Sequence, residues 1–261
     1  MDYKGYLIDL DGTMYRGEEI INGAKQFIDL LNDRDIPYLF ITNNATYTMK
    51  MLVDKLTRLD LKATEHNILT SAMATAKYIK DKNNQARCYV IGETGLVKAI
   101  ENEGLIVTDK HCDYVIVGLD RQITYDKLAK ACLLIREGAE FIVTNKDAAI
   151  PTEQGLIPGN GAIASSIAVS TGVEPLIVGK PESIIMTEAI KKIGIKKQDV
   201  LMIGDNYETD IKAGIYAGID TLMVLTGYST REDLQQVEVQ PTFVMENLLE
   251  WIEKGFDKVA T

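Results

Sequence analysis

Short, uninterrupted apolar runs recur along the chain, and each is followed by a segment in which apolar residues have helical spacing. The runs lie at residues 6–8, 38–41, 176–178, 200–203 and 221–225. Strands that are apolar at every position bury both faces, which is typical of a parallel sheet covered by helices on both sides. The pattern therefore predicts an α/β fold built on a doubly wound parallel sheet.

The middle of the chain repeats this pattern with its own material. Apolar runs at residues 88–91, 114–117 and 141–143 alternate with predicted helices over 96–103 and 125–137, and a polar stretch at residues 80–85 precedes them. This arrangement indicates a separate module inserted into the main domain. We predict a core formed by residues 1–79 and 178–261, and an inserted α/β cap domain over residues 80–177.

Net charge, apolar run length and cysteine spacing limit what the protein can bind and where it is expected to reside. The chain has 261 residues with 38 acidic and 28 basic side chains, a net charge of −10, which argues against non-specific binding to nucleic acid or to anionic membranes. The first residues lack the features of a signal peptide, and no apolar run approaches the ~20 residues that span a bilayer. Three cysteines without metal-site or redox spacing suit a reducing compartment. We expect a cytoplasmic protein.

Polar residues directly follow four of the apolar runs. In chain order the segments are Asp9-Leu10-Asp11-Gly12-Thr13, Thr42-Asn43-Asn44, Gly179-Lys180-Pro181, and Gly204-Asp205-Asn206 with Asp210 further along. Because the carboxyl ends of parallel strands meet at one edge of an open sheet, we expect all four segments to lie side by side there. Pro181 is expected at the first position of the following helix, where its missing N–H costs little.

These residue types suit a magnesium and phosphate site. Carboxylate oxygens are ligands that Mg²⁺ prefers, a hydroxyl beside backbone N–H groups binds anions, and Lys180 offers a point charge to a phosphate oxygen. Taken singly, each segment also fits an ordinary structural role: a solvated strand end, a helix cap or a charge near a helix terminus. Their ordered combination favours the functional interpretation.

The ordered set resembles the four motifs of the haloacid dehalogenase (HAD) superfamily of phosphatases. The insertion between the second and third motifs is similar to that superfamily's C2-type cap. Within it, Thr144-Asn145-Lys146-Asp147 and the later Pro158-Gly159-Asn160-Gly161 resemble the NagD-like branch. The resemblance implies a HAD-like Rossmannoid core and a Mg²⁺-dependent phosphatase that acts on small phosphomonoesters, such as sugar phosphates or nucleoside monophosphates.

The resemblance also implies roles for the core residues. Asp9 is the nucleophile that forms an aspartyl-phosphate, and it binds the metal. Asp11 is the general acid and base, with its backbone carbonyl on the metal. Asp205 is a further metal ligand, and Asp210 with Asn206 supports the metal's surroundings.

Substrate contacts follow from the same resemblance. The expected ligands of the phosphate are Thr42, Asn43 and Lys180, and Lys180 also counts among the catalytic residues. Asn44 is a further expected substrate-binding residue. The expected contacts to the leaving group are Asn145 and Asp147. Caps of this type often carry a dimer contact in related proteins, which leaves a homo-oligomer through the cap open.

Alternatives remain at this stage. A phosphomutase or phosphotransferase would share the core motifs, and a non-catalytic ligand-binding regulator could keep the fold. Residues 159–164 fit the dinucleotide pattern G-x-G-x-x-A, but no buried strand leads into them, so we predict a cap loop that enters a helix.

Overall fold

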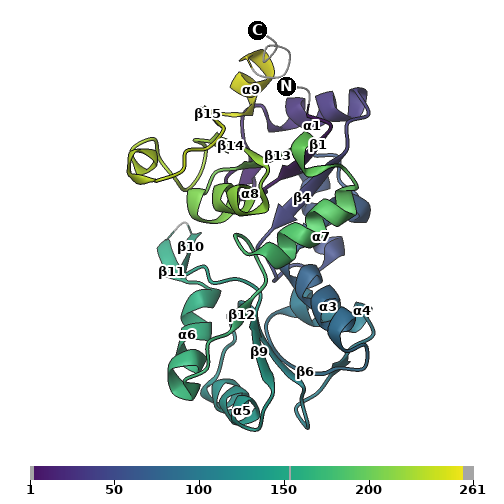
Figure 1. The fold of residues 1–261 in the computed structure, drawn as a ribbon, viewed down its shortest axis with the longest axis vertical. Helices are drawn as coiled ribbons and strands as arrows, with labels where there is room; N and C mark the ends of the chain where they lie inside the picture. Colours follow the sequence, from purple (N-terminus) through teal and green to yellow (C-terminus); the bar gives the residue numbers. More distant parts are fainter. Residues whose placement is uncertain (1–2, 153, 255–261) are drawn as a thin grey trace. The chain divides into compact units, whose positions relative to one another are not determined.

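A computed structural model describes residues 3–152 and 154–254 of the chain (Figure 1). Packing divides the chain into two compact units. The first unit comprises Met1–Thr42, Leu52–Leu69 and Lys180–Thr261, and the second comprises Asn43–Met51 and Thr70–Gly179.

A six-stranded sheet forms the centre of the first unit. Its strands, in spatial order, are β15 (Phe243–Met245), β14 (Asp220–Val224), β13 (Val200–Gly204), β1 (Gly5–Ile8), β4 (Tyr38–Thr42) and β5 (Ile68–Thr70). The strands from β15 to β4 pair in parallel. Since β1 has β4 on one side and β13 on the other, the chain reverses its direction of winding at β1, the position where open α/β sheets form their ligand crevice.

Helices flank this sheet, as the doubly wound prediction requires. They are α1 (Ala24–Asp33), α2 (Met49–Arg58), α7 (Ser183–Ile193), α8 (Lys212–Ala217) and α9 (Leu248–Lys254). Helix α1 packs beside α9, and α7 packs beside α8. The apolar residues of α1, at i, i+3, i+4 and i+7, form one stripe that is entirely buried. The predicted fold class is confirmed.

The second unit is built on a sheet of its own. Five strands lie in the order β12 (Leu176–Ile177), β9 (Glu140–Val143), β8 (Tyr114–Val117), β6 (Arg87–Ile91) and β7 (Ile106–Val107), all paired in parallel. Its helices are α3 (Ser71–Lys82), α4 (Thr94–Asn102), α5 (Tyr125–Arg136) and α6 (Asn160–Thr171). Helices α5 and α6 cover one face, where Val115, Phe141 and Leu134 share a buried apolar cluster.

Shorter elements complete the chain. Two hairpins are formed by β2 (Tyr15–Arg16) with β3 (Glu19–Ile20) and by β10 (Ala149–Thr152) with β11 (Gly155–Pro158). The 3₁₀ turns are η1 (Glu65–Asn67), η2 (Lys197–Asp199) and η4 (Asp233–Gln236), and η3 (Tyr207–Ile211) is a π-helical turn. Gly159 precedes α6 and follows the mostly exposed strand β11, so residues 159–164 enter a helix without a buried strand before them.

Two details differ from the sequence-based expectation. The run 176–178 was expected to supply a strand end on the same edge as the others, but β12 pairs with β9 in the second unit's sheet. Its two residues are only partly covered, so the apolar pattern alone did not reveal which sheet they join. Pro181 was expected to begin a helix, but it lies in a turn, and α7 begins at Ser183 after Glu182 as N-cap.

Helix α3 also groups differently from the expected division. It lies before residue 80, yet it packs with α4 as part of the second unit. The residues from 80 to 177 fall within the second unit, which in addition takes in residues 43–51, 70–79 and 178–179. A border placed at a polar stretch therefore misses a helix whose buried face belongs to the neighbouring unit.

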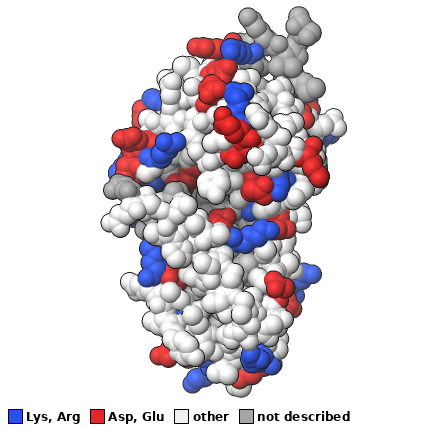
Figure 2. All heavy atoms as spheres, turned by 90° about the vertical axis from the view of Figure 1, so that its left-hand side faces the viewer, with Lys and Arg blue, Asp and Glu red and all other residues white. Residues whose placement is uncertain are grey.

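The surface carries both signs of charge. On the face drawn in Figure 2, Lys and Arg side chains are scattered among Asp and Glu side chains and form no continuous basic patch. Among the described residues, no helix combines the length and the apolar character needed to cross a bilayer. The three cysteines are free thiols, with Cys88 buried.

Candidate active site

Three strand ends of the first unit's sheet bring polar residues together. Asp9 directly follows β1, Thr42 is the last residue of β4, and Asp205 directly follows β13. Asp9 is 7% exposed, and Thr42 and Asp205 are each 3% exposed. Because β1 pairs with both β4 and β13, the carboxyl ends of these three strands lie side by side.

Lys180 completes this group from the chain that leaves β12. Its side chain is 2% exposed, and its Nζ lies 2.5 Å from Oδ1 of Asp9, 2.7 Å from Oδ1 of Asp210 and 3.0 Å from the carbonyl oxygen of Ile41. An ammonium has three donors, and these three acceptors engage all of them. Lys180 thus holds the predicted nucleophile and a second carboxylate on either side of one positive charge.

Asp205 is fixed through both of its carboxylate oxygens. Oδ1 accepts a hydrogen bond from the hydroxyl of Thr13 at 3.0 Å, and Oδ2 accepts one from the backbone N–H of Tyr228 at 2.7 Å. Tyr228 belongs to the loop after β14, where the hydroxyl of Thr226 also donates to the carbonyl of Gly12 at 2.6 Å. The loop therefore ties the segment after β1 to the segment after β13.

Glycine is required at two points around Asp205. A Cβ atom on Gly12, which has φ +90°, or on Gly227 would overlap the Asp205 carboxylate. Only a residue without a side chain allows the backbone to approach this closely. Gly12 belongs to the first predicted motif, whereas Gly227 was not predicted, because only its contact with the Asp205 carboxylate shows why glycine is needed there.

Asp210 lies in the π-helical turn η3 and is 1% exposed. Besides the bond from Lys180, its Oδ2 accepts the backbone N–H of Asn206 at 3.1 Å. The side-chain oxygen of Asn206 accepts the N–H of Glu208 at 3.0 Å and caps the same turn. Asn206 and Asp210 therefore hold each other in place beside Lys180.

Burial and mutual repulsion shift the proton affinities of this group. Desolvation, followed by the charge of Asp210, raises the pKa of Asp9 well above its usual range, although Lys180 acts in the opposite direction. Desolvation and Asp210 raise the pKa of Asp205 to about 7. Desolvation lowers the pKa of Lys180, but the Asp210 and Asp9 carboxylates outweigh it and raise the net pKa above its usual value.

The same group can hold a metal ion. Carboxylate oxygens of Asp9, Asp205 and Asp210 lie within 4.8 Å of one another, and all three residues are buried. Three buried carboxylates next to one ammonium have excess negative charge, which a divalent cation offsets. The donor atoms are all hard oxygens, as Mg²⁺ or Ca²⁺ requires. The arrangement fits a divalent cation.

Asp11 differs from its neighbours because solvent reaches it. Its Oδ2 accepts a hydrogen bond from the Tyr15 hydroxyl at 3.2 Å. Desolvation by surrounding atoms raises the pKa of Asp11, while the charge of Lys55 and the bond from Tyr15 act in the opposite direction. A carboxyl with a raised pKa and access to solvent suits proton transfer. Tyr15 and Lys55 were not among the residues singled out from the sequence.

The remaining predicted residues lie in the second unit. The carbonyl of Asn43 accepts hydrogen bonds from Asn145 Nδ2 at 3.0 Å and from the Ser71 hydroxyl at 2.7 Å, and Asn43 Nδ2 lies 3.5 Å from Oδ1 of Asp147. The Asn145 side-chain oxygen also accepts the N–H of Asp147 at 3.2 Å. The structure thus brings together Asn43, Asn145 and Asp147.

Asn44 has a local structural role in the same unit. Its side-chain oxygen accepts the N–H groups of Thr46 at 2.9 Å and Tyr47 at 3.2 Å, and the Thr46 hydroxyl at 3.0 Å. These bonds are typical of an Asx turn. The expected role of Asn44 in substrate binding stays a prediction.

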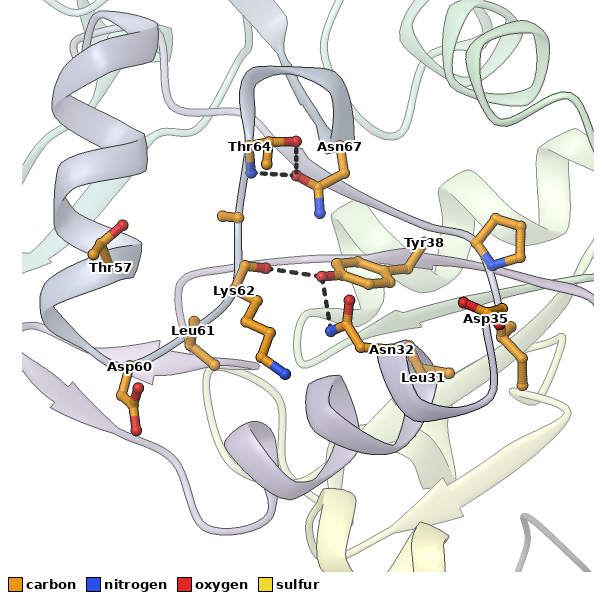
Figure 3. Close-up of a pocket in the computed structure, with 13 residues that line it drawn as sticks. Leu31, Asn32, Asp35, Tyr38, Thr57, Asp60, Leu61, Lys62, Thr64 and Asn67 are labelled. Atoms are coloured by element: carbon orange, nitrogen blue, oxygen red, sulfur yellow. Dashed lines mark hydrogen bonds between the residues drawn. The ribbon is translucent and has the colours of Figure 1, made fainter.

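A pocket of about 650 Å³ opens elsewhere in the first unit (Figure 3). It lies at the amino end of β4, opposite to Thr42, and none of the predicted site residues lines it. The Tyr38 hydroxyl, which points into this region, donates to the Lys62 carbonyl at 2.8 Å and accepts from Asn32 at 3.3 Å. The residues of the candidate active site therefore lie outside this pocket.

Comparisons with known proteins identify the family of this chain. A family model described as haloacid dehalogenase-like hydrolase matches residues 6–106, and a second HAD-hydrolase-like model matches residues 177–251. The chain is 53% identical to the 5'-nucleotidase YutF of Bacillus subtilis, over 96% of this chain and 98% of that protein. It is 51% identical to an acid sugar phosphatase of Staphylococcus aureus, over 96% and 97% of the two chains.

A solved structure has the same fold. The p-nitrophenyl phosphatase from Archaeoglobus fulgidus superposes with a TM-score of 0.92 at 34% identity, covering 97% of this chain and 99% of that one. The chain belongs to the haloacid dehalogenase-like hydrolases, and it is a hydrolase that acts on phosphoric monoesters.

Proposed function

We propose that this hydrolase cleaves small phosphomonoesters with the help of Mg²⁺, through a phosphorylated form of Asp9. One observation carries the proposal. Asp9 lies buried at the end of β1, bonded to Lys180 and within 4.8 Å of the Asp205 and Asp210 carboxylates. The named activities of the relatives, on nucleotides, sugar phosphates and p-nitrophenyl phosphate, support phosphate esters as the substrate class.

Asp9 performs the first half of the proposed reaction. A carboxylate oxygen of Asp9 bonds to phosphorus while the bond from phosphorus to the ester oxygen breaks, and that oxygen takes a proton from Asp11. The hydrogen bond from Lys180 holds Asp9 in one orientation and favours its ionised form. In the second half, Asp11 takes a proton from water, whose oxygen displaces Asp9 and releases inorganic phosphate.

Mg²⁺ at this group would be held by Asp9, Asp205 and the backbone carbonyl of Asp11. Its positive charge would offset the negative charge of the phosphate oxygens. Asp210 and Asn206 would support these ligands from beside them, because Asp210 accepts hydrogen bonds from Lys180, which also holds Asp9, and from the N–H of Asn206. Thr42, the last residue of β4, would bind a phosphate oxygen. The roles of Asn43, Asn145 and Asp147 toward substrate, a cytoplasmic location and a homo-oligomer through the second unit remain predictions.

Acid-quench labelling tests the proposal. The protein is mixed with Mg²⁺ and a ³²P-labelled phosphomonoester, and protein-bound label is counted beside released phosphate. We expect a base-labile label on the wild type, none on Asp9→Asn, and no turnover in EDTA until Mg²⁺ is restored. Asp120→Asn is the matched control, because Asp120 is also buried and ion-paired, with Lys127 at 2.7 Å in the second unit.

The outcomes separate the alternatives. Retention of more than about a tenth of the activity by Asp9→Asn would contradict its role as nucleophile. Transfer of the label to a second hydroxyl compound, in place of release as phosphate, would indicate a phosphotransferase or phosphomutase. Binding without turnover across sugar phosphates, nucleoside monophosphates and p-nitrophenyl phosphate would indicate a regulator.

A further inference from the structure

The first unit buries a lysine that the proposed reaction does not use. Lys55 lies on α2 between Leu52 and Leu56, and at 6% exposure it is one of the three buried residues of that helix. Burying an ammonium is unfavourable unless nearby groups stabilise its charge. Its position therefore calls for an explanation beyond packing.

The aromatic ring of Tyr15 is one such group. Lys55 Nζ lies 4.0 Å from the centroid of this ring, well within the range of a cation–π interaction. Tyr15 itself is 1% exposed. The ammonium thus fixes the ring in place from one face.

Tyr15 in turn contacts Asp11 through both side chain and backbone. Its hydroxyl donates to Oδ2 of Asp11 at 3.2 Å, its carbonyl accepts the N–H of Gly12 at 2.8 Å, and residues 11 and 15 form a β-bridge. Asp11 is the exposed member of the candidate site and carries few other constraints among the described residues. The three side chains form a line from the buried helix face to the carboxyl that faces solvent.

We infer that Lys55 and Tyr15 are positioning residues that hold the Asp11 carboxyl toward the ester oxygen of the substrate. The inference rests on the proposed role of Asp11. With Oδ2 bonded to Tyr15, the carboxyl rotates less and presents Oδ1 in one direction. Asp9 bonds to phosphorus while the bond from phosphorus to the ester oxygen breaks. The proton then moves from Asp11 to that departing oxygen.

Leaving-group dependence tests this inference. An alkyl phosphate needs a proton on its leaving oxygen, whereas p-nitrophenol leaves readily as the anion. We compare kcat/KM for p-nitrophenyl phosphate with kcat/KM for a sugar phosphate, for the wild type, Tyr15→Phe, Lys55→Met and Lys55→Arg. The ratio of the two values does not depend on how much of a preparation is folded, so partial misfolding of a variant cannot produce the result.

We expect Tyr15→Phe and Lys55→Met to lose about tenfold more activity on the sugar phosphate than on p-nitrophenyl phosphate, a part of the ~100-fold or more that a general acid supplies. Lys55→Arg keeps the cation over the ring and should restore most of the ratio. Lys82→Met is the control, since Lys82 lies 5.7 Å from the Tyr78 ring on α3 of the second unit; its ratio should equal that of the wild type.

Asp11→Asn separates the proposed role of Asp11 as general acid from the inferred positioning role of Lys55 and Tyr15. If Asp11→Asn leaves the ratio unchanged, the proposed role of Asp11 is wrong and the inference is overturned with it. If Asp11→Asn changes the ratio but Tyr15→Phe and Lys55→Met leave it as in the wild type, the inference alone is overturned. A change in all three variants with recovery in Lys55→Arg supports it.

Discussion

The two units are both parallel α/β sheets, but the carboxyl ends of their strands carry different chemistry. In the first unit the strand ends lead to Asp9, Thr42 and Asp205. In the second unit β6 leads to Gly92, β8 to Gly118 and β9 to Thr144 and Asn145. A parallel sheet provides an edge for a site, and the residues placed there decide whether that edge concentrates charge.

The two edges are also stabilised differently. In the second unit, neutral groups satisfy one another: Asn160 Nδ2 donates to the carbonyl of Asn145 at 2.8 Å and to that of Val117 at 3.2 Å. In the first unit, the ammonium of Lys180 lies between buried carboxylates. Removing one partner of a buried ion pair leaves an uncompensated charge, so the first edge should be much more sensitive to substitution, to pH and to cations.

Lys180→Met should have the largest effect. The substitution keeps the length of the side chain but leaves Asp9 and Asp210 facing each other without the ammonium. We expect a loss of about 3–5 kcal/mol in the free energy of unfolding at neutral pH and a fall in kcat on the order of 10³. Urea unfolding and phosphate release from p-nitrophenyl phosphate measure the two effects.

Lys127→Met is the matched variant in the second unit. Lys127 pairs with the buried Asp120 at 2.7 Å, but its own side chain is 39% exposed. Solvent can replace part of the lost interaction, so we expect a loss of about 1 kcal/mol. Equal losses in the two variants would show that the first edge is no more dependent on its cation than the second.

The pH dependence of stability should also separate the edges. The pKa of Asp205 is raised to about 7 in the folded chain, so between about pH 4 and pH 7 the folded state keeps a proton that the unfolded state has lost. Without metal, stability should therefore fall by a few kcal/mol as pH rises through this window. Mg²⁺ binds the deprotonated carboxylates, so it should raise Tm more at pH 8 than at pH 5.

Calorimetry in EDTA and in Mg²⁺, at both pH values, measures this effect. Asp205→Asn should flatten the slope of stability against pH and reduce the gain from Mg²⁺. A metal-free protein whose Tm rises steadily from pH 4 to pH 7 would contradict the assigned direction.

Much of the first edge could be predicted because strand ends are visible in sequence. Asp9, Thr42 and Asp205 each follow an apolar run directly, and the geometry of a parallel sheet then brings them together. Lys180 follows such a run as well, but its strand lies in the other sheet. The prediction placed Lys180 correctly for the wrong reason, since strand pairing depends on contacts far apart in sequence.

Residues that act through side-chain geometry were harder to find. Lys55 looks like an ordinary helix residue, and only its place between Leu52 and Leu56 indicated burial. Gly227 is recognisable only once Asp205 is known to lie against it. The border at residue 80 was inferred from local polarity, whereas α3 groups by its buried face, a long-range property.

Gly227→Ala should have an intermediate effect. Its Cβ would overlap the Asp205 carboxylate, so the carboxylate or the loop must move. We expect a loss of about 1–3 kcal/mol in stability and weaker Mg²⁺ binding, measured by the Mg²⁺ concentration that gives half-maximal activity. Gly118→Ala is the control at a strand end of the second unit, where the nearest atom is a methyl group of Leu96 that can rotate away; equal effects on Mg²⁺ binding would contradict the argument.

Asn160→Ala should have a small effect on stability, similar to that of Lys127→Met, although Asn160 is 1% exposed and lies at the second edge. Its Nδ2 faces two carbonyl oxygens, which fixes the orientation of the amide, and its Oδ1 has no hydrogen-bond partner among the described residues. Removing the amide loses these two hydrogen bonds and a longer one to the Thr144 hydroxyl at 3.4 Å, but it also removes an unsatisfied oxygen, so the contributions partly cancel. We expect a loss of about 1 kcal/mol by urea unfolding, independent of pH and of Mg²⁺. A loss of stability as large as that of Lys180→Met would mean that the neutral hydrogen-bond network is as sensitive to substitution as the buried ion pairs. The contrast between the two edges would then be wrong.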